Sequence, residues 1–131
     1  MNMLGIREPS VYGGRTFAEL EEYIRTEAVR LGLETEFFQS NHEGAIVDRI
    51  QQAYGKSDAI LINPAAYTHT SVAILDALRA VGLPTVEVHL SDIGSREEFR
   101  RFSYVSLYAA KVVKGMGFDG YRIALEFLSS N

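Results

Sequence analysis

The stretch that decides the fold is AILINPAAYTHTSVAILDALRAVGLPTVEVHL, residues 59–90. Residues 59–62 form a short apolar run, which is typical of a strand buried on both faces of a parallel sheet. Apolar residues then recur at helical spacing from about residue 71 to residue 80. Residues 85–90 alternate between apolar and polar side chains, which indicates a second strand. Strands that alternate with helices predict an α/β sheet.

The rest of the chain continues this alternation. A capping box at Thr16–Glu19 opens a helix that ends before Gly32, and a second box at residues 40–43 opens another helix. Residues 33–39 read as a strand between these helices, residues 109–113 as a further strand, and residues 119–129 as a final helix. We therefore expect one domain over residues 1–131, a doubly wound parallel sheet with helices on both faces and ligands at the carboxyl ends of its strands.

Composition narrows the functional classes. The chain has 131 residues, 47% hydrophobic and 23% charged, and no apolar segment approaches the ~18 residues that span a bilayer. We expect no membrane partner and no secretory signal. The absence of cysteine excludes disulfides and thiolate chemistry and fits a cytoplasmic protein. A net charge of −4 argues against nucleic acid, so an anionic small molecule is the better candidate ligand.

Glu87 and His89 are candidate acid–base residues, because they lie two apart on one face of the second strand. In that arrangement the carboxylate orients the imidazole and raises its pKa, which prepares it to donate a proton. The alternative is a half-exposed strand with a polar outer face, which the spacing alone slightly favours. A parallel strand covered on both faces needs another reason for these two residues.

Further polar residues follow the two strands. Asn63 and His69 come after the first one, although Asn63 could simply make an Asx turn and His69 could stand near a helix start. A capping box at residues 95–98 predicts a helical turn that places the guanidiniums of Arg96 and Arg100 on one side, where they suit carboxylate or hydroxyl oxygens. The alternative there is an exposed ion-pair turn.

The glycine motif at residues 115–120 matches G-x-G-x-x-G. Too few residues follow it for the second strand and acidic residue of a dinucleotide site, so we interpret it as a tight turn with close helix packing. The three histidines lack metal-ligand spacing, and we expect neither a metal nor a cofactor. With dinucleotide and metal sites set aside, acid–base catalysis by side chains is the chemistry that the sequence predicts.

Five ordered blocks resemble one family. LGIREPSVYGG, FFQSNHEG, INPAAYTHTSVAILDAL, VEVHLSDIGSREEFRRFSYVS and GMGFDGY are similar to the signature blocks of type II 3-dehydroquinate dehydratase. The resemblance implies a flavodoxin-like sheet with strand order 2-1-3-4-5 and a dodecamer built as a tetramer of trimers. It also implies a lyase of the shikimate pathway, which leads to aromatic amino acids, or of quinate catabolism. Such an enzyme removes water from 3-dehydroquinate by anti elimination through an enolate, without a metal or cofactor.

The resemblance also implies residue roles. Tyr12 would take the C2 proton, with Arg7 beside it lowering the tyrosine pKa, and His89 paired with Glu87 would protonate the departing C1 hydroxyl. The remaining implied residues contact the substrate or cover it: Asn63, His69 and Arg100 at the ring hydroxyls, Ser91 and the backbone of Leu90 at the carboxylate, Arg96 in a lid, and Asp76 at a neighbouring subunit's site.

The chain departs from the family pattern at several positions. Ala65 replaces the usual Gly, Leu75 the usual Arg, and Asp92 and Gly94 the usual Asn and His. Family members also carry a first strand and an Asn-Gly-Pro-Asn motif before the residues that match Met1 onward. Without that interior strand we expect the strand at residues 33–39 to be separated from the sheet. Loss of the second asparagine, an oxyanion donor, would cost on the order of 10²–10³ in turnover.

Two other functions stay open at this point. A truncated homologue could bind a polyhydroxy acid without turning it over. A receiver or flavin-binding domain on the same fold is a poorer interpretation of the sequence, because a receiver needs an aspartate where this chain has Asn63.

Overall fold

The computed structural model describes residues 1–6 and 14–130. At the centre of this part lies a parallel sheet of three strands in the order β1-β2-β3. The strands are β1 (Ile60–Ile62), β2 (Thr85–His89) and β3 (Lys111–Lys114). The central strand β2 is paired on both edges, Glu87 with Ile62 on one side and with Val112 on the other. The predicted parallel α/β sheet is confirmed.

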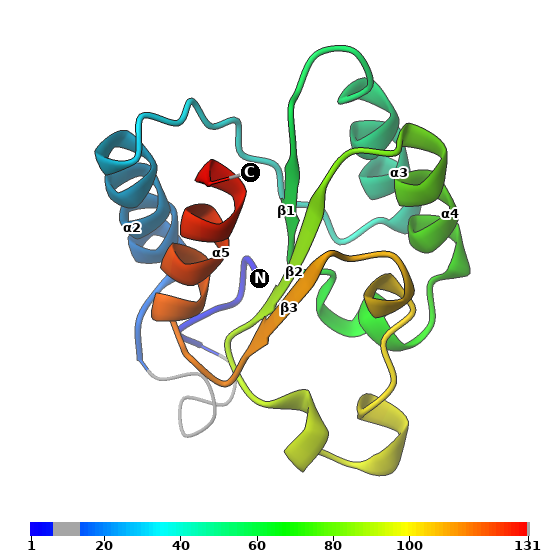
Figure 1. Ribbon diagram of the computed structural model, residues 1–131. Helices are drawn as coiled ribbons and strands as arrows, with labels where there is room; N and C mark the ends of the chain where they lie inside the picture. The colour runs from blue at the N-terminus through cyan, green and yellow to red at the C-terminus, as the bar shows by residue number, and fades with distance from the viewer. Residues whose placement is uncertain (7–13, 131) are drawn as a thin grey trace.

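Helices cover both faces of the sheet, as expected (Figure 1). On one face lie α2 (Phe17–Arg30) and α5 (Asp119–Ser129), and on the other lie α3 (Glu43–Gln52) and α4 (Val72–Val81). Val86 and Val88 of β2 belong to the core under α5, whereas Ile74 and Leu78 of α4 belong to the core on the opposite face. The alternation of β2 therefore directs its apolar side chains toward one layer of helices and Glu87 toward the other.

Of the two capping boxes predicted on long helices, the one at Thr16–Glu19 forms, and α4 has a cap at Ser71 that was not predicted. The hydroxyl of Thr16 accepts a hydrogen bond from the Glu19 N–H at 3.1 Å, and Ser71 caps α4 in the same way. The predicted box at residues 40–43 is wrong in detail. Its helix exists, but His42 is the N-cap without a side-chain bond, and the Ser40 hydroxyl accepts instead from the His42 N–H at 3.0 Å.

The prediction of a strand at residues 33–39 is wrong. The segment connects α2 to α3 without joining the sheet, whose described strands are β1, β2 and β3. A strand exists only where a neighbour pairs with its backbone, so side-chain pattern alone cannot make one. The expected separation of this segment from the sheet agrees with this finding.

The glycine motif after β3 forms a tight turn, as interpreted. Gly115 and Gly117 have φ of 77° and 55°, in the left-handed region that favours glycine. A Cβ on Gly120 would lie 3.4 Å from side-chain atoms of Val88 and Val113, so glycine allows α5 to pack closely on the sheet.

Short 3-10 turns surround the end of the sheet where β1 and β2 finish (Figure 1). They are η1 (Ala65–His69), η2 (Ile93–Ser95), η3 (Glu98–Arg100) and η4 (Val105–Leu107). Ala65 has φ of 53° and thus occupies the left-handed region with a side chain. Among the described helices, none is long and apolar enough to cross a membrane.

Candidate active site

An open pocket lies at the carboxyl ends of β1 and β2, where an α/β sheet is expected to bind its ligand. It has a volume of about 760 Å³ including its open mouth. Seven of the predicted site residues line it: Asn63, His69, His89, Leu90, Ser91, Arg96 and Arg100. The structure therefore brings together side chains from the ends of two strands and from the turns that follow them.

The other predicted site residues lie elsewhere. Glu87 is fully buried behind His89 rather than on the pocket wall. Asp76 is exposed on α4 and does not line the pocket, so its predicted place at a neighbouring subunit's site stays a prediction. Arg7 and Tyr12 lie outside the described residues.

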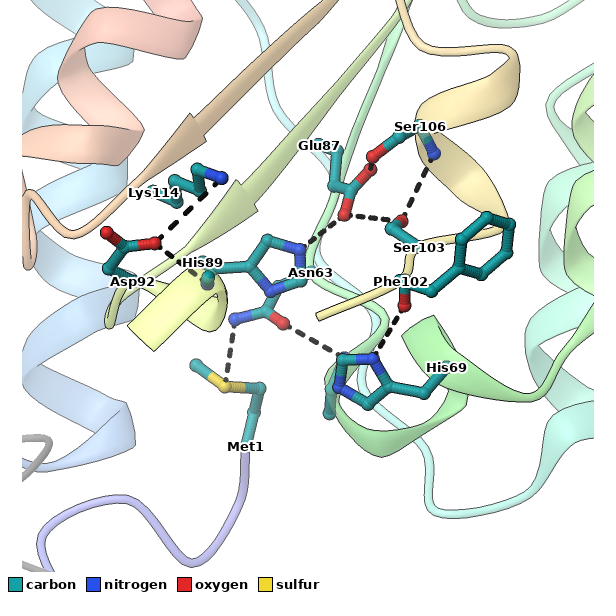
Figure 2. A network of polar contacts seen from close by, with 12 residues as sticks. Met1, Asn63, His69, Glu87, His89, Asp92, Phe102, Ser103, Ser106 and Lys114 are labelled. Carbon is teal, nitrogen blue, oxygen red and sulfur yellow. Dashed lines mark hydrogen bonds and ion pairs between the residues drawn. The ribbon is translucent and has the colours of Figure 1, made fainter. Parts of the chain in front are cut away.

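Glu87 and His89 form a buried pair. The Glu87 side chain is 0% exposed, and its Oε2 atom accepts a hydrogen bond from His89 Nε2 (Figure 2). Because Nε2 carries a proton toward the carboxylate, the other ring nitrogen, Nδ1, is left to serve the pocket. All five residues of β2 are buried, so the interpretation of a half-exposed polar strand is wrong.

The Glu87 carboxylate accepts two more hydrogen bonds. Ser103 Oγ donates to Oε2 and Ser106 Oγ donates to Oε1, each at 2.7 Å (Figure 2). Burial by itself raises the pKa of the Glu87 carboxyl, but the hydrogen bonds from His89, Ser106 and Ser103 outweigh it and hold the pKa below its usual value. Glu87 is therefore a carboxylate at neutral pH, as its interaction with the imidazole requires.

His69 reaches the pocket from the end of η1. Its Nδ1 atom lies 2.8 Å from the carbonyl oxygen of Phe102. A carbonyl oxygen only accepts, so Nδ1 is the protonated nitrogen and Nε2 of the neutral ring is an acceptor. The two histidines of the pocket thus have opposite arrangements, with Nε2–H held by the protein in His89 and Nδ1–H held in His69.

Asn63 makes the Asx turn that the sequence left as an alternative, and it lines the pocket as well. Its Oδ1 accepts from the Ala65 N–H at 3.0 Å. Its Nδ2 donates to the Tyr121 hydroxyl oxygen at 3.2 Å and lies 3.3 Å from the Met1 sulfur. Burial raises the pKa of Tyr121 to about 12, so this hydroxyl stays neutral. Asn63 therefore both stabilises the turn after β1 and lines the pocket.

Both predicted arginines line the pocket, but not through the predicted helical turn. Arg96 precedes η3, whereas Arg100 ends it, and the Ser95 hydroxyl donates to the Asp92 carbonyl at 2.8 Å instead of capping a helix. Arg100 Nε pairs with Glu97 Oε2 at 2.7 Å. The ion pair expected from the alternative interpretation thus forms, and its arginine also lines the pocket.

Sequence reasoning assigned no role to Ser103, Ser106 or Tyr121, the supports of Glu87 and Asn63. The two serines had a signal, because Ser-x-x-Ser places two hydroxyls on one side of a tight turn directly after the arginines. Tyr121 had none, since it lies 58 residues from Asn63 and meets it only through the packing of α5. Within the described part of the chain, no group of three or more histidines and carboxylates is placed to hold a metal ion.

Comparison with known proteins identifies relatives along the whole chain. The family model described as dehydroquinase class II matches residues 1–129. Catabolic 3-dehydroquinase 1 of Aspergillus terreus is 53% identical over 131 residues, which are 100% of this chain and 86% of that protein. The 3-dehydroquinate dehydratase of Endomicrobium trichonymphae is 54% identical over 130 residues, covering 99% of this chain and 91% of that protein.

A solved structure agrees. The type II dehydroquinase from Butyrivibrio crossotus superposes with a TM-score of 0.94 at 44% identity, covering 97% of this chain and 89% of that one. The parallel sheet with helices on both faces is accordingly of the flavodoxin-like type that the resemblance implied. The chain belongs to the class II dehydroquinase family.

Proposed function

We propose that this chain dehydrates 3-dehydroquinate to 3-dehydroshikimate. The observation that carries the proposal is the His89 imidazole on the pocket wall, held through Nε2 by the buried Glu87 carboxylate. A general acid needs a positioned proton and a counter-charge that stabilises its protonated form, and this pair supplies both. The names of the relatives from Aspergillus terreus and Endomicrobium trichonymphae give the substrate.

In the proposed reaction two bonds break. A base takes the C2 proton, and the electron pair of that C–H bond forms an enolate with the C3 carbonyl. The C1–O bond then breaks as the enolate collapses to the conjugated enone, and the departing oxygen takes the Nδ1 proton of His89 and leaves as water. Tyr12 with Arg7 beside it is the proposed base, and this assignment rests on the sequence resemblance alone.

The pocket supplies groups that suit a polyhydroxy acid. We assign Arg100, Asn63 and the Nε2 acceptor of His69 to the ring hydroxyls, because they offer both donors and acceptors. Ser91 and the Leu90 backbone are assigned to the carboxylate, and Arg96 to a lid over the substrate. The pathway is then quinate catabolism or the shikimate pathway, in which the same reaction occurs.

The experiment is a direct absorbance assay for the enone formed from 3-dehydroquinate, with the protein and with His89→Ala. Product formed by the first and lost in the second supports the proposal. Binding of 3-dehydroquinate without product in either protein would instead favour the non-catalytic homologue.

The proposed assembly is a dodecamer made of trimers, in which the exposed Asp76 of α4 reaches a neighbouring site. Light scattering of the purified protein tests it, and a monomer at assay concentration would contradict the role of Asp76.

A further inference from the structure

Residues 102–106 support both histidines of the pocket from one short segment (Figure 2). The Phe102 carbonyl accepts the Nδ1–H of His69 at 2.8 Å. One residue later, Ser103 donates to Glu87 Oε2, and Ser106 donates to Glu87 Oε1. Each oxygen of the carboxylate that holds His89 therefore receives a hydroxyl from this segment.

The direction of the Ser103 hydrogen bond is determined by its surroundings. The Ser103 oxygen accepts from the Ser106 N–H at 3.1 Å, so its single proton is free to point at Glu87. The segment is anchored on both sides, because the Tyr104 N–H donates to the Thr68 carbonyl at 3.0 Å and Val105 is fully buried against α4. The two hydroxyls are thus placed before any substrate arrives.

We infer that Ser103 and Ser106 are positioning residues for the proposed reaction. As a two-serine clamp they keep the Glu87 carboxylate ionised and oriented toward the Nε2–H of His89, so that Nδ1 presents its proton to the pocket. This inference rests on the proposed function. Neither serine lines the pocket, so the clamp acts on the proton and not on substrate binding.

The electrostatic surroundings of Glu87 are simple. His89 is the titratable group that bonds to it, and the helices packed against this face contribute the apolar residues Ile74, Leu78 and Val105 to the core there. Lys111 and Lys114 of β3 lie on the neighbouring strand, with Lys111 directed over the Phe127 ring and Lys114 paired with Asp92. Besides the hydrogen bond from His89, the two serine hydroxyls are the donors that hold the pKa of Glu87 below its usual value.

The test compares Ser103→Ala, Ser106→Ala and the double variant with wild type. Ser129→Ala, the same change at an exposed helix end, is the matched control. In each single variant we expect the acid limb of the kcat/KM profile to move up by about 1–2 pH units, the equivalent of one hydrogen bond to a charged group, and to move further in the double variant, which loses two such bonds. We expect kcat to fall by about 10–100-fold on the same basis, with KM nearly unchanged.

Ser106→Thr is the rescue variant, because Ser106 is exposed enough to accept a methyl group while its hydroxyl is retained. We expect its acid limb to lie with that of wild type rather than that of Ser106→Ala. A lower melting temperature with an unmoved pH profile would mean that the serines only fill space, and this outcome overturns the inference. If the double variant does not fold, the same pH profile is compared between Ser106→Ala and wild type.

Failure of the proposed function is distinguished by a readout that needs no turnover. Carbon-13 NMR of labelled glutamate side chains, assigned with Glu87→Gln, follows the titration of the Glu87 carboxyl directly. The clamp predicts a higher apparent pKa of Glu87 in the double variant, even if wild type forms no enone. An identical Glu87 titration in both proteins refutes the clamp, whereas absence of product in wild type refutes the activity.

Discussion

The replacement Glu87→Gln tests the Glu87–His89 pair most directly. Glu87 accepts three hydrogen bonds, from His89 Nε2, Ser103 and Ser106. A glutamine has one acceptor oxygen and an NH₂ group that opposes at least one of these donors. It also removes the charge that stabilises a protonated imidazole.

Loss of a hydrogen bond between charged groups is worth about 1.5–3 kcal/mol, so kcat is expected to fall about 10–150-fold. KM should change little, because Glu87 does not line the pocket. The assay is the initial rate of enone formation over a range of 3-dehydroquinate concentrations, with Glu126→Gln at the surface as the control. An unchanged kcat, or a loss confined to KM, would refute the reasoning.

The same replacement has a pH-dependent effect on stability. The folded state holds the pKa of Glu87 below its usual value of 4.5, so its carboxylate contributes stability that is fully present above pH 4.5. That contribution is lost as the pH falls through the lower folded value. The destabilisation by Glu87→Gln, measured by denaturant unfolding, should therefore be largest near neutral pH and shrink in acid. If the difference in free energy of unfolding between wild type and Glu87→Gln grew in acid, the Glu87 pKa would be raised rather than lowered by folding, and the reasoning would be contradicted.

The remaining predictions concern three other positions. His89→Ala is expected to lower kcat by about 10²–10⁴-fold, the range for a general acid, while the size of the assembly by light scattering stays unchanged. Ala65→Gly should raise the free energy of unfolding by up to about 1 kcal/mol, because relief of a left-handed alanine outweighs the added chain entropy; a lower melting temperature would contradict this. Tyr121→Phe removes the acceptor of the Asn63 amide and should cost about 0.5–1.5 kcal/mol of stability and raise KM. An unchanged KM would show that Tyr121 does not orient Asn63 for the substrate.

Local patterns in the sequence determined most of the fold. The apolar run of β1, the alternation of β2 and the caps at Thr16 and Ser71 each act within a few residues, so their consequences follow from the chain itself. Part of the pocket lining, including Asn63, His69 and His89, was predictable for the same reason, because the carboxyl ends of parallel strands meet at one edge. The strand expected at residues 33–39 failed because strand formation depends on a partner that side-chain pattern does not supply.

The supports of the site were decided only by the tertiary structure. The spacing of Glu87 and His89 placed both residues on one face of the strand but left open whether that face is exposed. Packing of α4 and η4 buries this face, so the Glu87–His89 pair is shielded from solvent. Desolvation in turn required donors for the carboxylate, and these come from Ser103 and Ser106, 16 and 19 residues away. The sequence by itself named seven of the residues that line the pocket, whereas the hydrogen bonds that hold them depend on distances between segments, which exist only after the chain has folded.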